Sequence, residues 1–229
     1  MLNKIELLYG GNTIMEKFIQ PYTYNFIQFQ ANELLKAHRS LNDFATIQTM
    51  KLVVVEKILT RFNQPTESEK ELLNRIVQFS HSQKEMDAYL ILLEDFIIPF
   101  EQPSDAALKK LFRKTKKLHI PNWDTLNLAD YTFYGWNDAG KQRKYLILFE
   151  QQKLIGIEGT LSPTTHKGFC AICHTSSQVS LFMNIGKHNK DGQFTSKGNY
   201  ICHDSHQCNK NIMELDELQK FIGIVKQKE

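Results

Sequence analysis

The four cysteines of the chain all stand in one segment. Two residues separate the members of the first pair and five separate those of the second, with 28 residues between the pairs; the positions are Cys170, Cys173, Cys202 and Cys208. Thiolates in two such pairs are preferred ligands of Zn²⁺, which binds four of them in a tetrahedron. The spacing therefore predicts one zinc ion. Because four thiolates leave no open position for water, we expect this ion to be structural and not catalytic.

Other chemistries of paired cysteines stay open from the residues alone. Residues 170–174 match the C-x-x-C-H of haem attachment, but haem would leave the second pair without a role. Disulfides need an oxidising compartment, and a redox C-x-x-C belongs to a strand and helix pattern that is missing here. One histidine could also replace a cysteine ligand, the candidates being His174, His203 and His206. We favour zinc held by the four cysteines, with the histidines as flanking polar residues.

Local patterns place the two cysteine pairs on different elements. Gly168 precedes the first pair and suits a tight turn. Residues 181–183 and 199–201 are typical of short strands around a polar, glycine-containing loop. A helix is expected to begin after Cys202, so the second pair would come from a strand end and a first helical turn. A knuckle, a hairpin and a helix start in this order indicate a treble-clef-like zinc finger.

The first hundred residues have helical periodicity. Apolar residues at three-and-four spacing predict helices over 24–38 and 44–62, and capping-box sequences at 66–69 and 82–85 precede two further apolar stripes. Four helices with short connections predict an antiparallel bundle. We place this bundle in a first domain, residues 1–100, and treat residues 1–14 as an extension to which we assign no structure.

A linker with two prolines, residues 99–104, precedes a mixed pattern of helices and strands. The predicted elements are a helix over 105–118, strands over 131–136, 143–150 and 153–160, and a terminal helix over 214–226. The predicted fold class is thus α+β. It consists of a four-helix bundle followed, over 101–229, by a mixed α/β domain with the treble-clef-like four-cysteine finger.

Charge is distributed unevenly along the chain. The net charge is −2 over residues 1–100 and +5 over residues 101–229. Six cations belong to the predicted helix 105–118: Lys109, Lys110, Arg113, Lys114, Lys116 and Lys117. Such a helix could bind RNA phosphates, anionic lipid or an acidic protein surface, although a solvated charged face is the commoner explanation of a charge run. We therefore expect an acidic partner, if any, at the second half.

Several functional classes are disfavoured by what the sequence lacks. It contains no G-x-x-x-x-G-K-[ST], G-x-G-x-x-G, H-E-x-x-H or G-x-S-x-G motif, so we do not expect an enzyme. No apolar run approaches the roughly 18 to 20 residues of a membrane span. The start of the sequence also lacks the apolar run of a signal peptide. We expect a cytoplasmic protein without membrane association.

Residues around the cysteines are the candidate binding site. Phe169 adjoins the first cysteine, Lys197 and Tyr200 lie on the strand that leads into the third, and Phe221 lies on the terminal helix. Aromatic side chains and a lysine around a small rigid module suit a protein-binding hot spot. Alternatively, the three aromatic residues fill the thin core of the zinc module. The residues alone leave both interpretations open.

Longer motifs carry a resemblance to a known family. They are P-Y-T-Y-N-F-I from Pro21, I-I-P-F-E-Q-P-S from Ile97, F-R-K-T-K-K-L-H-I-P from Phe112, Y-G-W-N from Tyr134, K-G-F-C-A-I-C from Lys167, V-S-L-F-M from Val179 and K-G-N-Y-I-C-H-D-S-H-Q-C-N-K from Lys197. With them, most of the chain resembles the fusidic acid resistance proteins of the FusB and FusC type, also described as elongation factor G-binding proteins. The last motif is the most specific, and residues before Met15 exceed the family pattern.

The resemblance implies both a fold and a function. It implies a helical bundle followed by a mixed domain in which the four cysteines hold zinc. It also implies that the protein binds elongation factor G and promotes its release from ribosomes on which fusidic acid has trapped it. Resistance would then arise by target protection that restores translation, without chemical modification of the drug. Phe169, Lys197, Tyr200 and Phe221 are implied to face elongation factor G.

Other partners follow from the same reasoning. We expect a monomer that does not bind nucleic acid directly. The alternative function is that of an RNA- or ribosome-binding zinc-finger protein that uses the basic helix 105–118. A third possibility, a hydrolase that acts on the antibiotic, has no candidate residues.

Overall fold

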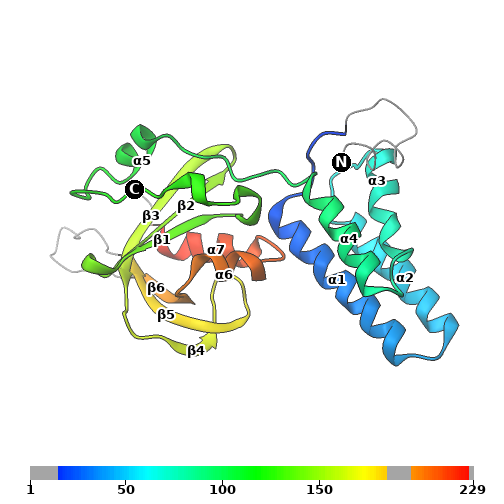
Figure 1. Ribbon diagram of the computed structural model, residues 1–229. Coiled ribbons are helices and arrows are strands. Elements are labelled where there is room, and N and C mark those ends of the chain that lie inside the picture. The colour runs from blue at the N-terminus through cyan, green and yellow to red at the C-terminus, as the bar shows by residue number, and fades with distance from the viewer. Residues whose placement is uncertain (1–14, 185–196, 227–229) are drawn as a thin grey trace. The chain divides into compact units, whose positions relative to one another are not determined.

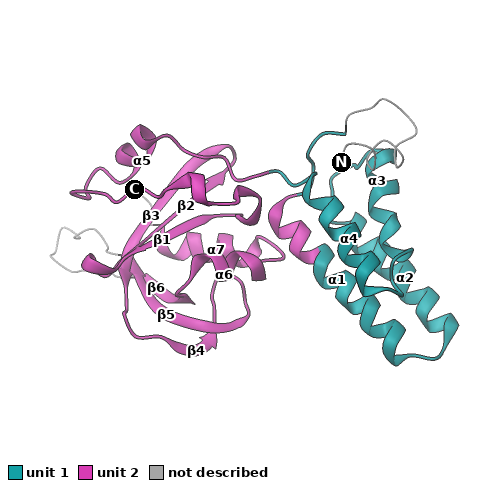
Figure 2. Ribbon diagram, viewed as in Figure 1, with its two compact units in different colours: residues 1–19, 27–98 teal, residues 20–26, 99–229 magenta. Residues whose placement is uncertain are grey.

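The structure, a computed structural model, describes residues 15–184 and 197–226. The expected N-terminal extension and most of the expected loop between the two cysteine pairs lie outside these residues. The chain forms two compact units, residues 1–19 with 27–98 and residues 20–26 with 99–229, which Figure 2 draws in different colours. Among the described residues, no helix is both long enough and apolar enough to cross a membrane.

The first unit consists of α-helices joined by short connections (Figure 1). They are α1 (Pro21–Ser40, from residue 27 on), α2 (Phe44–Leu59), α3 (Glu67–Asn74), which continues into a 3₁₀ turn (Arg75–Val77), and α4 (Gln83–Glu94). Thr66 and Glu69 form the expected capping box of α3, and Asp43 and Ser82 cap α2 and α4. These side chains accept hydrogen bonds from N–H groups that have no partner inside the helix. The predicted helical N-terminal region is confirmed.

The second unit is built on one antiparallel sheet, six-stranded within the described residues. Its strands are β1 (Tyr134–Asp138), β2 (Arg143–Glu150), β3 (Lys153–Leu161), β4 (His166–Phe169), β5 (Ser176–Asn184) and β6 (Lys197–Cys202). The order is β1-β2-β3-β5-β4, and β6 pairs with β5. Gln151 and Gln152 both have positive φ, which is the turn geometry that joins two strands through two residues. The mixed second half of the predicted α+β fold is confirmed.

Three helices complete this unit: α5 (Asp105–Leu111), α6 (Ser205–Asn211) and α7 (Asp216–Val225). In Figure 1, α6 lies against β1 and β6, and α7 lies against β6. The start of α1 belongs here as well, because Asn25 donates hydrogen bonds to the carbonyl oxygens of Asn209 (2.7 Å) and Ile212 (2.8 Å) at the end of α6. The boundary between the two compact units therefore does not lie at the linker alone, because residues 20–26 belong to the second unit.

β2 is buried on both faces, because it separates two hydrophobic cores. Leu146 and Leu148 belong to a core that includes the four cysteines, whereas Tyr145 and Ile147 belong to a mainly aromatic core. This is the alternation expected of a strand, whose successive side chains point to opposite faces. In the aromatic core, the rings of Trp136 and Tyr145 stack with their centroids 5.1 Å apart. One face of β2 therefore packs in the same core as the four cysteines.

The predicted basic helix is wrong beyond Leu111, where α5 ends. Phe112 follows with φ −108° and ψ 41°, outside the helical region, and its side chain is buried in the aromatic core. A helix that continued through residue 118 would need a helical backbone at this position. The burial of Phe112 instead directs the chain into a turn.

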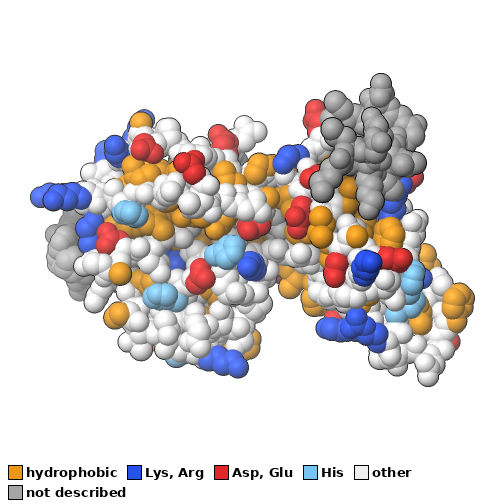
Figure 3. All heavy atoms as spheres, viewed as in Figure 1, with side chains coloured by type: hydrophobic (Ala, Val, Ile, Leu, Met, Phe, Trp, Pro, Cys, Tyr) orange, Lys and Arg blue, Asp and Glu red, His pale blue; other side chains and the backbone are white. Residues whose placement is uncertain are grey.

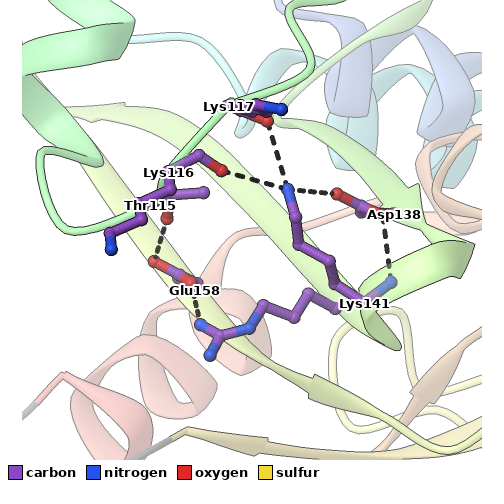
Figure 4. A network of polar contacts seen from close by, with 7 residues as sticks. Thr115, Lys116, Lys117, Asp138, Lys141 and Glu158 are labelled. Atoms are coloured by element: carbon purple, nitrogen blue, oxygen red, sulfur yellow. Dashed lines mark hydrogen bonds and ion pairs between the residues drawn. The ribbon is translucent and has the colours of Figure 1, made fainter.

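Contacts from distant parts of the sequence hold this turn (Figure 4). The Lys141 ammonium donates to the carbonyl oxygens of Lys116 (3.3 Å) and Lys117 (3.1 Å), and Lys117 has a positive φ of 53°. The Thr115 hydroxyl donates to the Glu158 carboxylate at 2.9 Å. The six cations of residues 109–117 are therefore exposed on a short helix and an anchored turn, and do not line one helical face.

Candidate metal centre and the surface beside it

The four cysteines come from three different elements of the second unit. Cys170 and Cys173 lie in the turn after β4, Cys202 ends β6, and Cys208 lies in α6. The first pair forms a knuckle, because the Cys170 N–H donates to the Thr175 carbonyl oxygen at 3.1 Å. The order of knuckle, strand end and helix is the one expected from the sequence.

The four sulfurs form one compact group. All lie within 4.8 Å of one another, and the Sγ–Sγ distance is 3.7 Å both for Cys170 with Cys208 and for Cys173 with Cys202. These distances are far longer than a disulfide bond of about 2.05 Å. They match the edge of about 3.8 Å that a tetrahedron has when its zinc–sulfur bonds are about 2.3 Å long. The donor set and its geometry therefore fit one structural Zn²⁺.

Hydrogen bonds around the sulfurs support this fit. The Cys170 Sγ accepts from the backbone N–H groups of Ile172 and Cys202, both at 3.3 Å, and such bonds favour the thiolate. Hydrogen bonding with the Cys170 sulfur, and then with the other two sulfurs, raises the pKa of Cys208 well above its ordinary value, and burial adds to this. A bound zinc ion supplies positive charge that stabilises the deprotonated form, so all four cysteines can be thiolates at the same time.

The three candidate histidines have other partners. His174 Nε2 lies 3.1 Å from Glu217 Oε2, and His203 Nδ1 lies 2.9 Å from the Ser180 hydroxyl. The ring of His206 packs against an aromatic ring, not against the sulfurs. Within residues 15–184 and 197–226, the four cysteines are the group of side chains that could hold a metal ion. The preference for cysteine ligands over histidine therefore stands.

Two of the predicted partner-binding residues are exposed aromatics beside this centre. Phe169, directly before the knuckle, is 77% exposed, and Tyr200 is 42% exposed. The Tyr200 carbonyl oxygen accepts from the Ala171 N–H of the knuckle at 2.9 Å, and its ring contacts His166 edge-on at 4.7 Å. Because both aromatic residues are tied to the knuckle, a bound metal would fix their positions.

The other two predicted residues differ from each other. Lys197 is exposed at the start of β6. Phe221 is 1% exposed, and its ring lies 5.8 Å from that of Phe182 in the core that contains the cysteines. The aromatic residues could either fill the core of the zinc module or form a protein-binding surface. Phe221 fills the core, whereas the side chains of Phe169 and Tyr200 are exposed and accessible to a partner.

A cavity of about 520 Å³ opens between the knuckle and α7. Phe169, Phe221 and the half-exposed Ile224 contribute apolar side chains to its lining. Phe221 thus forms part of the cavity wall while remaining almost fully buried. The cavity and the exposed Phe169 together make an apolar surface next to the metal centre.

A small charged group on the same cavity was not anticipated from the sequence. Glu217 accepts from Lys220 at 2.6 Å and pairs with His174 at 3.1 Å. The hydrogen bond from Lys220 lowers the pKa of the Glu217 carboxyl. The three-residue spacing of Glu217 and Lys220 on a helix was the available signal. The link to His174 depends on the tertiary fold and had no sequence signal.

Comparison with known proteins agrees with this architecture. Residues 18–101 match the family described as "Elongation factor G-binding protein, N-terminal", and residues 107–223 match "FBP C-terminal treble-clef zinc-finger". The solved structure of the fusidic acid resistance protein FusC is similar, with a TM-score of 0.81 and 34% identity over 93% of this chain and 100% of that chain. A search of curated protein sequences gave no match. The treble-clef prediction is confirmed, and the chain belongs to the elongation factor G-binding protein family.

Proposed function

We propose that this protein confers fusidic acid resistance by binding elongation factor G and promoting its release from ribosomes stalled by the drug. Family membership supports the choice of partner. The observation that carries the location of the site is the 77% exposure of Phe169, which directly precedes a knuckle that zinc would hold rigid. A large aromatic side chain that stays exposed on a rigid element suits a protein-binding hot spot.

Each of the four residues has a role in this proposal. Phe169 and Tyr200 provide apolar contact, Lys197 provides a positive charge at the rim, and Phe221 supports the surface from the core. The activity is binding, so no chemical step on the drug is involved. The protein acts as a monomer in the cytoplasm, where its proposed partner works.

Binding can release elongation factor G only under one condition. The protein must bind more tightly to a conformation of the factor that the ribosome holds less well, because a ligand shifts an equilibrium only by its difference in affinity for the two states. We propose that the second domain, residues 101–229, makes this contact and that residues 1–100 form a separate helical domain. The compact units support this division except at residues 20–26, which pack with the second unit.

We expect Phe169→Ala and Tyr200→Ala each to weaken the affinity for purified elongation factor G by about tenfold or more, as for interface hot spots. Lys197→Ala should lower it less and make binding less sensitive to salt, because a rim charge acts mainly through steering. Phe44→Ala is the matched control, since Phe44 is 73% exposed on α2 of the other unit. Isothermal titration calorimetry gives all four affinities.

The same variants should protect translation in proportion to their affinity. In an in vitro translation reaction with fusidic acid, wild type and Phe44→Ala should restore synthesis equally, and Phe169→Ala should restore less at the same protein concentration. If Phe169→Ala and Tyr200→Ala bind like wild type while folded and zinc-loaded, the assigned surface is wrong. If wild type itself shows no affinity for elongation factor G, the proposed function is wrong.

The exposed cations of residues 109–117 favour one alternative function, the binding of RNA phosphates. They lie around α5, where blue side chains are visible in Figure 3. None of them takes part in an ion pair of the described residues with an acidic side chain, in contrast to Lys70 and Lys220. This alternative predicts that the protein binds RNA alone, with an affinity that falls steeply as salt rises. The proposed function predicts instead that the double variant Lys109→Gln with Lys110→Gln still rescues translation. Filter binding of the protein to duplex RNA at two salt concentrations distinguishes the RNA-binding function from the proposed function.

A further inference from the structure

The strands β4, β5 and β6, which lie side by side in Figure 1, place the two exposed aromatic residues of the finger on opposite faces of the sheet. Phe169 on β4 pairs with Ser176 on β5, and Tyr200 on β6 pairs with Leu181 on β5. Side chains of paired residues lie on the same face, whereas those of successive residues in a strand alternate between the faces. Because residues 176 and 181 are an odd number of positions apart on β5, Phe169 and Tyr200 point to opposite faces.

The neighbours of the two aromatic side chains agree with this assignment. The Tyr200 ring contacts the His166 ring with centroids 4.7 Å apart, and the strand register places both residues on the same face. Phe169 instead lines the cavity beside α7 together with Asn199, which precedes Tyr200 and therefore belongs to the other face. We define the tyrosine face as the exposed surface formed by His166, Leu181 and Tyr200.

The large hydrophobic side chains that are exposed in the described part of the second unit all lie around the finger. Phe169 and Ile224 line the cavity, while Leu181, which is 36% exposed, and Tyr200 are cross-strand partners on the tyrosine face. Single exposed apolar residues are normal on a protein surface, but several that gather on one small module mark a protein-binding site. One partner that contacts both faces of the finger accounts for both pairs.

The charge of these three strands indicates what such a partner must present. Their lysines are Lys167 and Lys197, both exposed, and none of the three strands contains an aspartate or a glutamate. Complementary interfaces place opposite charges against each other and apolar groups against apolar groups. A matching surface is therefore apolar in its middle and acidic at its rim, and we expect this chemistry in the contact patch of elongation factor G.

We propose that the tyrosine face is a second contact surface for elongation factor G, with Leu181 and His166 as contact residues beside Tyr200. The factor then binds both faces of the finger, one through Phe169 and the cavity and the other through the tyrosine face. Leu181 and His166 are additional to the four partner-binding residues that the family resemblance implies. This inference rests on the proposed function, because it assigns a further part of the surface to the same partner.

Isothermal titration calorimetry with purified elongation factor G measures the contribution of the tyrosine face. Leu181→Glu should weaken the affinity by about tenfold or more, because its carboxylate would meet an apolar patch with an acidic rim, and Leu181→Lys should weaken it less. His166→Ala should weaken it by about two- to fivefold, as for a contact at the edge of an interface. Leu52→Glu is the matched control and should bind like wild type, since Leu52 is a 73% exposed leucine on α2 of the first unit. If both Leu181 variants bind like wild type while Phe169→Ala is impaired, the tyrosine face is not a contact surface and the proposed function stands.

Photocrosslinking covers the case in which the charged variants do not fold. Leu181, Ile224 and Leu52 are each replaced by p-benzoylphenylalanine, a bulky apolar residue that suits an exposed position, and zinc content shows that each protein is loaded. On irradiation with elongation factor G, position 181 on the tyrosine face and position 224 at the cavity should both crosslink to the factor, and position 52 should not. A crosslink from position 224 without one from position 181 would overturn the proposal. If wild type itself has no affinity for elongation factor G, the proposed function fails and this inference fails with it.

Discussion

Cys208→Ser should abolish zinc binding and unfold the second compact unit of this protein. Cys208 is 1% exposed and shares one core with the other three cysteines and with Phe182 and Phe221. Structural zinc contributes on the order of 10 kcal/mol to the folding of small modules. That is comparable to the whole stability of a typical domain, about 5 to 15 kcal/mol. Removal of one ligand also leaves buried thiols in a core shaped around an ion, so the loss is cooperative.

Tryptophan fluorescence measures this result selectively. The chain has two tryptophans, Trp123 and Trp136, and both are buried in the second unit. Wild type with excess chelator should show the same red-shifted emission as Cys208→Ser. The control is His174→Ala, which should keep one zinc per chain by elemental analysis, because His174 pairs with Glu217 and not with the metal site. A Cys208→Ser protein with a full equivalent of zinc and native fluorescence would contradict the four-cysteine centre.

The metal centre could be predicted because its information is local in the sequence. Two pairs of cysteines with short spacings specify the ion, and a strand pattern ending at Cys202 specifies how the second pair is presented. β2 was likewise predicted with its observed bounds, Arg143–Glu150, since its run of strand-forming residues ends at a turn signal. The helix starts after Thr66 and Ser82 could be predicted because their capping side chains act within three residues.

The errors and omissions concern contacts between residues that are far apart in the sequence. The helix over 105–118 was predicted from spacing alone, whereas Lys141 and Glu158 hold its second half as a turn. Lys144 is buried on β2 because two cores enclose this strand. The burial of Phe221 could not be predicted from the sequence, because an aromatic residue suits a protein-binding hot spot and a hydrophobic core equally well. Only packing against Phe182 distinguishes the two.

The role of Asn209 was also not predicted from the sequence, although this residue directly follows the ligand Cys208. It is 0% exposed, and its Oδ1 accepts from the N–H groups of Thr132 (2.7 Å) and Phe133 (3.2 Å). Its Nδ2 donates to the carbonyl oxygens of Phe133 (2.9 Å) and Ser205 (2.8 Å). The amide thus uses all of its hydrogen-bonding capacity. It joins α6, which carries a zinc ligand, to the segment before β1.

Asn209→Ala should lower the free energy of unfolding of the second unit by about 3 to 5 kcal/mol, because several buried backbone groups lose their partners. Urea denaturation followed by tryptophan fluorescence, with zinc in excess, gives this value. Gln207→Ala is the control on the same helix, since Gln207 is exposed, and it should change stability by less than about 0.5 kcal/mol.

Asn209→Asp keeps the shape of the side chain and tests the direction of these hydrogen bonds. Aspartate has no N–H donors, so a carboxylate would face the two carbonyl oxygens in a buried site, and its pKa in the folded state should rise above the unfolded value of about 3.9. Protonation then favours the folded state. The destabilisation relative to wild type should therefore be larger at pH 7 than at pH 5 and should shrink further as the pH falls towards the unfolded pKa. Equal stability of Asn209→Asp and wild type at neutral pH would show that the donors of Asn209 contribute nothing to holding α6 on the sheet.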